Sequence, residues 1–291
     1  MSVVRPRRSA LYMPGSNPRA LEKARGLACD VIIIDLEDAM APESKDVARQ
    51  IIASALAEGG YGGREILLRV NGLDTPWGHA DLTFAAGQPI DGVVLPKVES
   101  VDAVRRAEMV LGARDDLGLW CMLETPRGVL AAQQIAGATP RMTGFLMGTS
   151  DLAKDLHCLH TPDRLPMLTA LGLCLLAARA EGLAILDGVY LDLDDNDGFE
   201  ASCRQGRDLG FDGKTLIHPK TLTVANRVFA PDAKAVDWAR KISQAHAAAM
   251  AEGKGVLLVE GKLIEALHVT EAQRLLALAD GIAALETRVV C

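Results

Sequence analysis

Short apolar runs separated by helical segments recur along most of the chain, and this repeat constrains the fold more than any other feature. The run at residues 31–34 is an unbroken β-branched stretch, typical of a strand buried on both faces of a sheet. Eight runs of this kind predict strands at residues 10–13, 31–34, 66–70, 93–95, 119–123, 144–147, 185–190 and 213–217. Helices are expected at residues 18–27, 44–57, 101–111, 129–137, 162–182 and 200–209.

Alternation of strands with helices predicts a parallel sheet, and eight strands predict a closed (β/α)8 TIM barrel, whose usual length is about 250 residues. An open doubly wound sheet is the rival arrangement, but no Gly-x-Gly-x-x-Gly motif follows the first strand. We therefore expect a TIM-barrel catalytic domain at residues 1–230. Residues 231–291, with helices at 236–250 and 271–285, are expected to form a C-terminal helical extension and lid.

Charge and composition exclude several classes of partner. The net charge of −7 argues against nucleic acid, because binding phosphates requires a basic surface. No basic segment followed by an apolar one opens the chain, and the most apolar stretch, 171–186, is interrupted by Arg179 and Glu181. The six cysteines include no Cys-x-x-Cys pair and are interpreted as reduced thiols. These features predict a cytoplasmic protein that binds neither nucleic acid nor membrane.

Polar side chains follow almost every predicted strand. In a TIM barrel these positions surround the active site, because the C-terminal ends of all eight strands lie at one end of the barrel. At least five carboxylates there would repel one another unless cations lie among them. The candidate site residues at these strand ends are Ser16, Asn17, Asp35, Glu37, Asp38, Arg69, Asn71, Lys97, Glu99, Glu124, Ser150, Asp151, Asp192 and His218.

Two of these acids follow neighbouring strands and are separated by one βα unit. Glu124 follows the fifth strand and Asp151 the sixth, so both carboxylates should leave the same end of the sheet. A pair of carboxylates suits Mg²⁺, which proteins hold with one or two carboxylates plus waters and substrate oxygens. The alternative interpretation is that both acids cap helices, since the segments that follow are helical.

The motifs at the strand ends resemble those of the citrate lyase β-subunit-like family, which includes malyl-CoA and citramalyl-CoA lyases and is related to the HpcH/HpaI aldolases. The resemblance covers most of residues 8–230. It rests on the segments RSALYMPGS at 8–16, DLEDA at 35–39, LRVN at 68–71, LPKVE at 95–99, ETP at 124–126, GTSDL at 148–152 and GKTLIHP at 213–219.

The resemblance implies a set of site residues. Glu124 and Asp151 would bind Mg²⁺, with Mn²⁺ as an alternative ion, and would lie with Ser150 against the substrate. Arg69 would contact the substrate carbonyl or carboxylate and stabilise an enolate, with Glu37 and Asp38 near the metal and its waters. Further contacts concern coenzyme A: Arg19 and Lys23 would approach its phosphates, and His218 and Pro219 its pantetheine arm.

The resemblance also implies the reaction. A β-hydroxyacyl-CoA of the malyl-, citramalyl- or citryl-CoA type would be cleaved between Cα and Cβ to a 2-oxo acid and acetyl-CoA, or formed in the reverse Claisen-type condensation. In the family a lid aspartate reaches the active site of the next subunit. The corresponding motif here, GKLIE at 261–265, carries Glu265 in its place. A homotrimer or hexamer with shared lids is therefore expected.

Four other functions stay open at this level. A malyl-CoA thioesterase would differ only in the position of one water, and a citrate lyase β subunit would act on an acyl-carrier-protein thioester within a complex. A CoA-independent HpcH/HpaI aldolase would use a His after an early strand, whereas Asp35, Glu37 and Asp38 occupy that place. A scaffold without activity is disfavoured because Arg69, Glu124 and Asp151 are all present.

Overall fold

A computed structural model of the chain describes residues 4–38, 44–251 and 257–289. Ala39, part of one motif above, and Cys291 lie outside the described residues. The chain divides into two compact units, one of Arg7–Phe229 and one that joins the segment up to Pro6 with the segment from Ala230 onward. Each unit is described by itself below.

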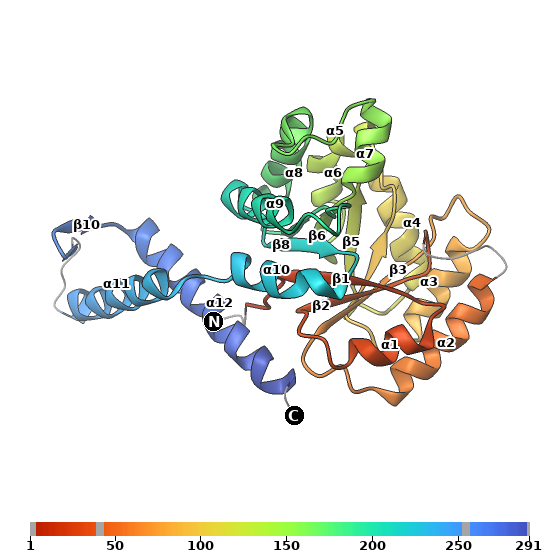
Figure 1. Cartoon of the computed structure of the whole chain (residues 1–291), viewed down its shortest axis with the longest axis horizontal. Helices are drawn as coiled ribbons and strands as arrows, with labels where there is room; N and C mark the ends of the chain where they lie inside the picture. Colours follow the sequence, from red (N-terminus) through yellow and green to blue (C-terminus); the bar gives the residue numbers. More distant parts are fainter. Residues whose placement is uncertain (1–3, 39–43, 252–256, 290–291) are drawn as a thin grey trace. The chain divides into compact units, whose positions relative to one another are not determined.

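The first unit is a closed barrel of eight parallel strands in sequential order, with helices around it (Figure 1). This confirms the predicted (β/α)8 TIM barrel. The strands are β1 Ser9–Pro14, β2 Val31–Asp35, β3 Glu65–Arg69, β4 Gly92–Leu95, β5 Gly118–Leu123, β6 Met142–Met147, β7 Ala184–Asp187 and β8 Gly213–Leu216. The helices are α1 Pro18–Ala24, α2 Lys45–Glu58, α3 Gly78–Ala86, α4 Val101–Leu111, α5 Pro126–Leu130, α6 Ala132–Ala136, α7 Thr149–Leu156, α8 Leu168–Ala180, α9 Asn196–Leu209 and α10 Leu222–Phe229, with short 3-10 turns η2 Leu165–Met167 and η3 Pro219–Thr221.

The helices and strands differ from the sequence prediction at four places. Strand β7 ends at Asp187 rather than at residue 190, because the Asp187 carboxylate accepts the N–H of Gly188 and turns the chain out of the sheet. The helix expected at 162–182 begins only at Leu168, since Arg164 adopts a left-handed conformation (φ 53°). Helix α3 was not expected from the sequence, and the helix expected at 129–137 is split in two at Ala131.

The inside of the barrel is filled by every second residue of each strand, as the two-residue repeat of a strand requires. The apolar layer consists of Ala10, Val31, Ile33, Leu67, Val94, Trp120, Met122, Leu146 and Leu186. Trp120 is fully buried there, and a Cβ atom on Gly144 of the next strand would lie 2.4 Å from its ring. The barrel therefore accommodates a tryptophan because its neighbour is glycine.

Two buried ion pairs lie at the N-terminal end of the barrel. Arg8 donates to both carboxylate oxygens of Asp30 at 2.9 Å. Arg7 donates to both oxygens of Glu65, and its guanidinium lies 5.0 Å from the centre of the Trp120 ring. Charged groups at this end of a TIM barrel serve stability, because the loops that carry chemistry are at the other end.

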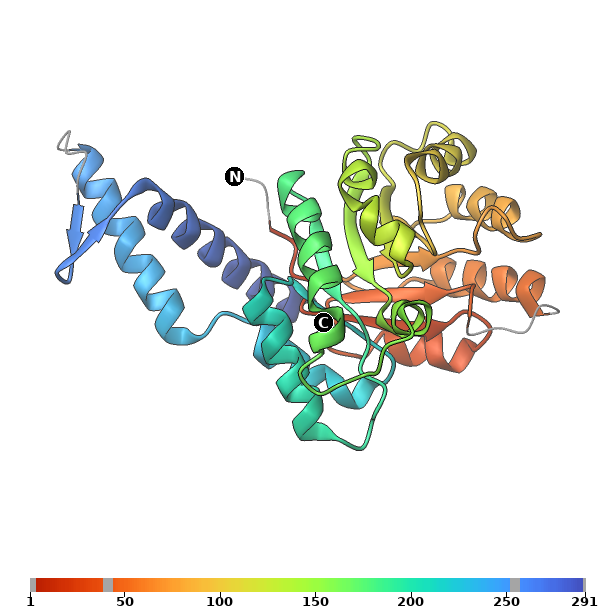
Figure 2. The ribbon, with the colours of Figure 1, turned by 90° about the horizontal axis from the view of Figure 1, so that it is seen from above.

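The second unit is built on two long helices, α11 Ala233–Ala251 and α12 Ala266–Val289, which lie side by side in Figures 1 and 2. Between the two helices in the sequence is an antiparallel hairpin of β9 Leu257–Val259 and β10 Lys262–Ile264. The side chains of Ala239, Ile242, Val259, Ile264, Val269 and Ala272 form its own apolar core. Within the described residues, no helix has the length and apolarity needed to span a bilayer.

The packing of Trp120 gives a first prediction. Gly144→Ala should lower the free energy of unfolding by about 2 kcal/mol, because the new methyl group meets the indole ring and the Ala184 carbonyl, 2.6 Å away. Gly172→Ala in α8 is the control: nothing lies within 4 Å of the added Cβ, so helix propensity should raise stability by about 0.5–1 kcal/mol. Urea denaturation of both variants measures the difference, and equal stabilities would show that the barrel interior yields to the added methyl.

Candidate active site at the C-terminal end of the barrel

A cavity of about 390 Å³ opens at the C-terminal ends of the strands. Its polar lining comes from four strand ends and the first turn of α7, and its apolar lining includes Tyr12, Met122, Met147, Val189 and Ile217. The polar lining residues are Asp35, Asp38, Arg69, Glu124, Thr149, Ser150, Asp151 and Thr215. The fold thus brings Arg69, Asp38, Glu124, Ser150 and Asp151, all named from the sequence, around one space.

Arg69 is held in a fixed orientation. Its Nε and Nη2 donate to the two carboxylate oxygens of Asp35 at 2.7 and 2.6 Å, and its guanidinium lies 4.8 Å from the centre of the Tyr12 ring. Asp35 and Arg69 are opposite each other in the register of β2 and β3 and both face inward. Burial alone would lower the pKa of Arg69, but Asp35 outweighs it and holds that pKa above its usual value. Of the three guanidinium nitrogens, only Nη1 faces groups other than Asp35.

Glu124 is buried, with 2% of the residue exposed. Its Oε1 accepts the backbone N–H of Lys97 at 2.8 Å. A Cβ on Gly148 would lie 2.4 Å from Oε2, so glycine at 148 allows the carboxylate to lie where it does. Burial, together with the charges of Glu37 and Asp151, raises the pKa of Glu124 to about 7, which the backbone N–H and the charge of Lys97 counteract only in part.

Asp151 is the third residue of helix α7, and 30% of its side chain is exposed. Within the part of the chain that the structure describes, its ion pair is the 3.2 Å contact between Oδ1 and Lys154 Nζ, one helical turn on. Gly148, not Asp151, caps the start of α7, and the hydroxyl of Thr125, not Glu124, caps α5. The interpretation of the two acids as helix caps is therefore wrong for this structure.

The two acids supply the oxygen donors that a hard divalent cation prefers. Among the residues that the structure describes, no group of three or more His, Cys, Asp or Glu side chains is placed to hold a metal. Any ion here would take its remaining ligands from water and substrate, as is usual for Mg²⁺. The poorly compensated charge of Glu124 fits such an ion.

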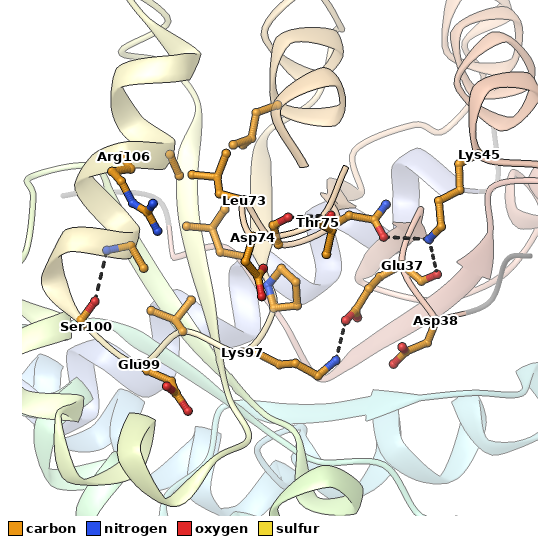
Figure 3. Close-up of a pocket in the computed structure, with 18 residues that line it drawn as sticks. Glu37, Asp38, Lys45, Leu73, Asp74, Thr75, Lys97, Glu99, Ser100 and Arg106 are labelled. Carbon is orange, nitrogen blue, oxygen red and sulfur yellow. Dashed lines mark hydrogen bonds and ion pairs between the residues drawn. The ribbon is translucent and has the colours of Figure 1, made fainter. Parts of the chain in front are cut away.

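A second cavity of about 440 Å³ is lined by both Glu37 and Asp38 (Figure 3), whereas of these two only Asp38 also lines the first cavity. Glu37 accepts the Lys97 Nζ at 2.7 Å, and its other oxygen is 2.9 Å from Arg69 Nη1. Burial raises the pKa of Glu37 more than Arg69 and Lys97 lower it. Asp38 is mostly exposed, with its nearest oxygen 3.6 Å from Arg69 Nη1. The second cavity is lined by neither Glu124 nor Asp151, so we place the site in the first.

A hydrogen-bond network under this loop fixes the position of Glu37. Lys45 Nζ donates to the backbone carbonyls of Leu36 and Glu37, both at 2.9 Å, and to Asn71 Oδ1 at 2.7 Å. Asn71 in turn donates to Asp81 at 2.6 Å. Asn71, a candidate from its place after the third strand, thus supports the Glu37 loop and lines the second cavity but not the first.

The other residues named from the sequence lie elsewhere. Arg19 and Lys23 are exposed on α1, and neither lines the cavity. His218 is exposed, and its Nδ1 accepts the Lys220 N–H at the start of η3, next to the half-buried Pro219. Glu265 belongs to the second unit, where its backbone begins α12 and its side chain is exposed.

Three residues have roles at the site that the sequence pattern did not single out. Asp35 was only one of several rim acids, although its place two residues after the inward Ile33 indicates that it points into the barrel. Tyr12 lies two residues after the inward-facing Ala10, so the same two-residue repeat indicates that it also points into the barrel. Nothing in the sequence marks Lys97 as a residue with a positive φ, 49°.

The chain is similar in sequence to a known protein family and to several named relatives. The chain matches the HpcH/HpaI aldolase/citrate lyase family over residues 8–219. It is 51% identical over 279 residues to a (3S)-malyl-CoA thioesterase of Cereibacter sphaeroides, covering 96% of each chain. It is 34% identical to the citrate lyase subunit beta of Leuconostoc mesenteroides, covering 96% of this chain and 95% of the relative. An L-malyl-CoA/beta-methylmalyl-CoA lyase of C. sphaeroides is 33% identical, with 96% of each covered.

A solved structure is similar over almost the whole chain. Protein CitE of Mycobacterium tuberculosis, in complex with magnesium, acetoacetate and coenzyme A, superposes with a TM-score of 0.75 and 30% identity, covering 94% of this chain and 97% of that one.

The burial of Glu124 gives a second prediction. Its folded pKa of about 7 lies above the ordinary 4.5, so its protonated form stabilises the fold below pH 4.5, and that contribution is lost as the pH rises through 7. Without metal at pH 8, Glu124→Gln should therefore exceed the wild type in stability by on the order of 2 kcal/mol, and the difference should shrink towards pH 5. Denaturation in EDTA at both pH values measures it.

Glu99→Gln is the matched control, because 43% of the Glu99 side chain is exposed and its carboxylate stays in water. It should behave like the wild type at both pH values. A Glu124→Gln variant that gained nothing at pH 8 would contradict the assignment of Glu124 as a poorly compensated buried charge.

Proposed function

The chain belongs to the HpcH/HpaI aldolase/citrate lyase family, and we propose that it is a Mg²⁺-dependent enzyme acting on a malyl-CoA-type thioester. The observation that carries the proposal is the buried, incompletely compensated Glu124 in one cavity with Asp151 and the fixed guanidinium of Arg69. Relatives named as citrate lyase and as malyl-CoA enzymes support the substrate class.

Glu124 and Asp151 would hold the ion, and the magnesium named in the CitE complex supports this choice. When bound there, Mg²⁺ supplies a positive charge for carboxylate and hydroxyl oxygens of the substrate. Glu37 and Asp38 would accept hydrogen bonds from water around it. Ser150, in the first turn of α7 beside Asp151, would offer its hydroxyl to the substrate carboxylate.

We take hydrolysis of (3S)-malyl-CoA as the first candidate reaction, because 51% identity over 96% of both chains links this protein to a thioesterase of that name. Water attacks the thioester carbonyl carbon, the C–S bond breaks, and malate and coenzyme A leave. Arg69 would stabilise the carbonyl oxygen as it gains negative charge, since Nη1 is the part of its guanidinium that Asp35 leaves available.

Cleavage of the Cα–Cβ bond is the second candidate, favoured by similarity to an L-malyl-CoA/beta-methylmalyl-CoA lyase. The substrate hydroxyl loses its proton, the carbon–carbon bond breaks, and its electrons move into the thioester enolate. Glyoxylate leaves, and the enolate takes a proton to become acetyl-CoA. The same guanidinium serves both reactions, because each places negative charge on the thioester oxygen.

Coenzyme A would enter over α1 and η3. Arg19 and Lys23 are exposed cations on α1, free to approach phosphates, and His218 and Pro219 follow β8, which pairs with β1 in the closed barrel. The coenzyme A named in the CitE complex supports a site of this kind on the shared fold.

A homo-oligomer with shared lids is part of the same proposal. Glu265 would supply an acid to the site of a neighbouring subunit, where its extra methylene relative to aspartate extends its reach.

One assay separates the candidate reactions. Purified protein receives malyl-CoA and Mg²⁺, and free thiol and 2-oxo acid are measured in parallel, with citramalyl-CoA and citryl-CoA as further substrates. Thiol and malate without glyoxylate would establish the thioesterase, and glyoxylate with acetyl-CoA would establish the lyase. Either activity should disappear in EDTA and fall at least 100-fold in Glu124→Ala, while Glu99→Ala stays close to the wild type. Turnover of none of the three thioesters would overturn the proposal and direct the test to acyl-carrier-protein thioesters.

Complementation tests the shared lid. Glu124→Ala and Glu265→Ala should each be inactive alone, and co-expressed they should recover about one quarter of the wild-type activity, since random assembly pairs an intact barrel with an intact lid at that frequency. Glu124→Ala with Asp151→Ala is the control, because both defects fall in the same barrel and no intact site can form. Full activity of Glu265→Ala alone would remove Glu265 from the mechanism.

A further inference from the structure

Lys97 adopts a backbone conformation that a lysine enters only at a cost. Its φ of 49° lies in the left-handed region, where the Cβ atom of an L-residue comes too close to the following carbonyl oxygen. Glycine would take the same conformation without strain. Among the described residues, only His157, Arg164 and Glu260 share a positive φ without being glycine. The structure therefore holds a lysine where the backbone alone favours glycine.

The left-handed turn directs the backbone N–H of Lys97 at Glu124. The hydrogen bond to Oε1 is 2.8 Å long, and among the described residues it is the only hydrogen bond to this carboxylate. Any residue except proline could donate it, so this contact explains the conformation but not the lysine side chain.

The side chain reaches the other acid. Lys97 Nζ donates to Glu37 Oε1 at 2.7 Å, a contact visible in Figure 3. Glu37 Oε2 is buried and, although 2.9 Å from Arg69 Nη1, has no hydrogen bond of good geometry in the described structure. Lys97 is thus the group that orients the Glu37 carboxylate beside the guanidinium of the site.

A half-exposed ion pair of this kind, with 47% of the lysine side chain accessible, adds little to stability. Its contribution would not offset the strain at Lys97 on its own. Stability therefore does not explain why this position carries an ammonium group, whereas the orientation of the Glu37 carboxylate does.

We propose that Lys97 is a positioning residue that sets both carboxylates of the site, Glu124 through its backbone N–H and Glu37 through its ammonium group. This deepens the proposed function, on which its kinetic consequences rest. The two interactions act separately. The N–H orients Glu124 towards Asp151. The ammonium group keeps Glu37 within reach of Arg69, although Glu37 and Arg69 form no hydrogen bond of ideal geometry.

Lys97→Gly separates the two interactions, since it keeps the N–H, relieves the strain and removes the ammonium. We expect unchanged or higher thermal stability, Mg²⁺ affinity within twofold of the wild type by calorimetry, and a kcat at least tenfold lower with little change in KM. Lys97→Met should lose the same factor, and Lys97→Arg should regain part of it. In the double variant with Glu37→Gln the losses should not add, because both changes remove one interaction.

His157→Gly is the matched control. His157 has a φ of 54°, is exposed at the end of α7, and lies outside the cavity. It should gain stability like Lys97→Gly and keep its kcat, which shows that relief of strain alone does not slow the enzyme.

A crystal structure of Lys97→Gly provides a readout that needs no activity. The N–H of residue 97 should remain on Glu124 while the Glu37 carboxylate leaves its place beside Arg69. Glu37 in its original place, a kcat within twofold of the wild type, or a parallel loss of Mg²⁺ affinity would each overturn the proposal. Failure of the proposed function would show differently, as a wild type that turns over no thioester, and the structure and the Mg²⁺ titration would still decide the role of Lys97.

Discussion

The ion pair between Arg69 and Asp35 joins the packed interior of the barrel to the cavity above it. Arginine does not lose its charge in proteins, so a buried guanidinium requires a carboxylate beside it. Register places Asp35 opposite Arg69, and two hydrogen bonds fix the plane of the guanidinium. The ring of Tyr12 and the oxygen of Glu37 then lie where this plane leaves room for them. The direction in which the site offers positive charge is therefore set by two neighbouring strands.

Negative charge exceeds positive charge around this centre. Asp35 pairs with Arg69, and Glu37 pairs with Lys97 and Arg69. Glu124 has one backbone N–H and the charge of Lys97, which forms its ion pair with Glu37, while Asp151 has an exposed lysine. Carboxylates in a low-dielectric cavity are costly unless a proton or a cation joins them. The raised pKa of Glu124 and the proposed Mg²⁺ site are two consequences of this imbalance, because the proton and the metal ion compete for the same oxygen.

One fold serves relatives named as lyases and as thioesterases, so the barrel does not decide which bond breaks. Both reactions place charge on a thioester oxygen, which Arg69 would stabilise under the proposed function. They differ in whether water reaches the carbonyl carbon. Glu37 lines the second cavity, and its carboxylate accepts a hydrogen bond from the ammonium group of Lys97.

The sequence by itself indicated the eight-stranded barrel, because alternating apolar runs and helices predict a parallel sheet and no Gly-x-Gly-x-x-Gly motif supports the rival open sheet. It also indicated Arg69, Glu124 and Asp151, since polar residues after buried strands must gather at one end. The helix α3 escaped prediction because its segment is short and starts at Gly78, without a side chain that caps it. Only the tertiary structure decided that Asp35 neutralises Arg69, that Lys97 turns its N–H to Glu124, and that Arg19 and Lys23 lie outside the cavity. The reason is geometric: contacts between side chains of different strands depend on closure and register of the barrel, which no local pattern of residues encodes.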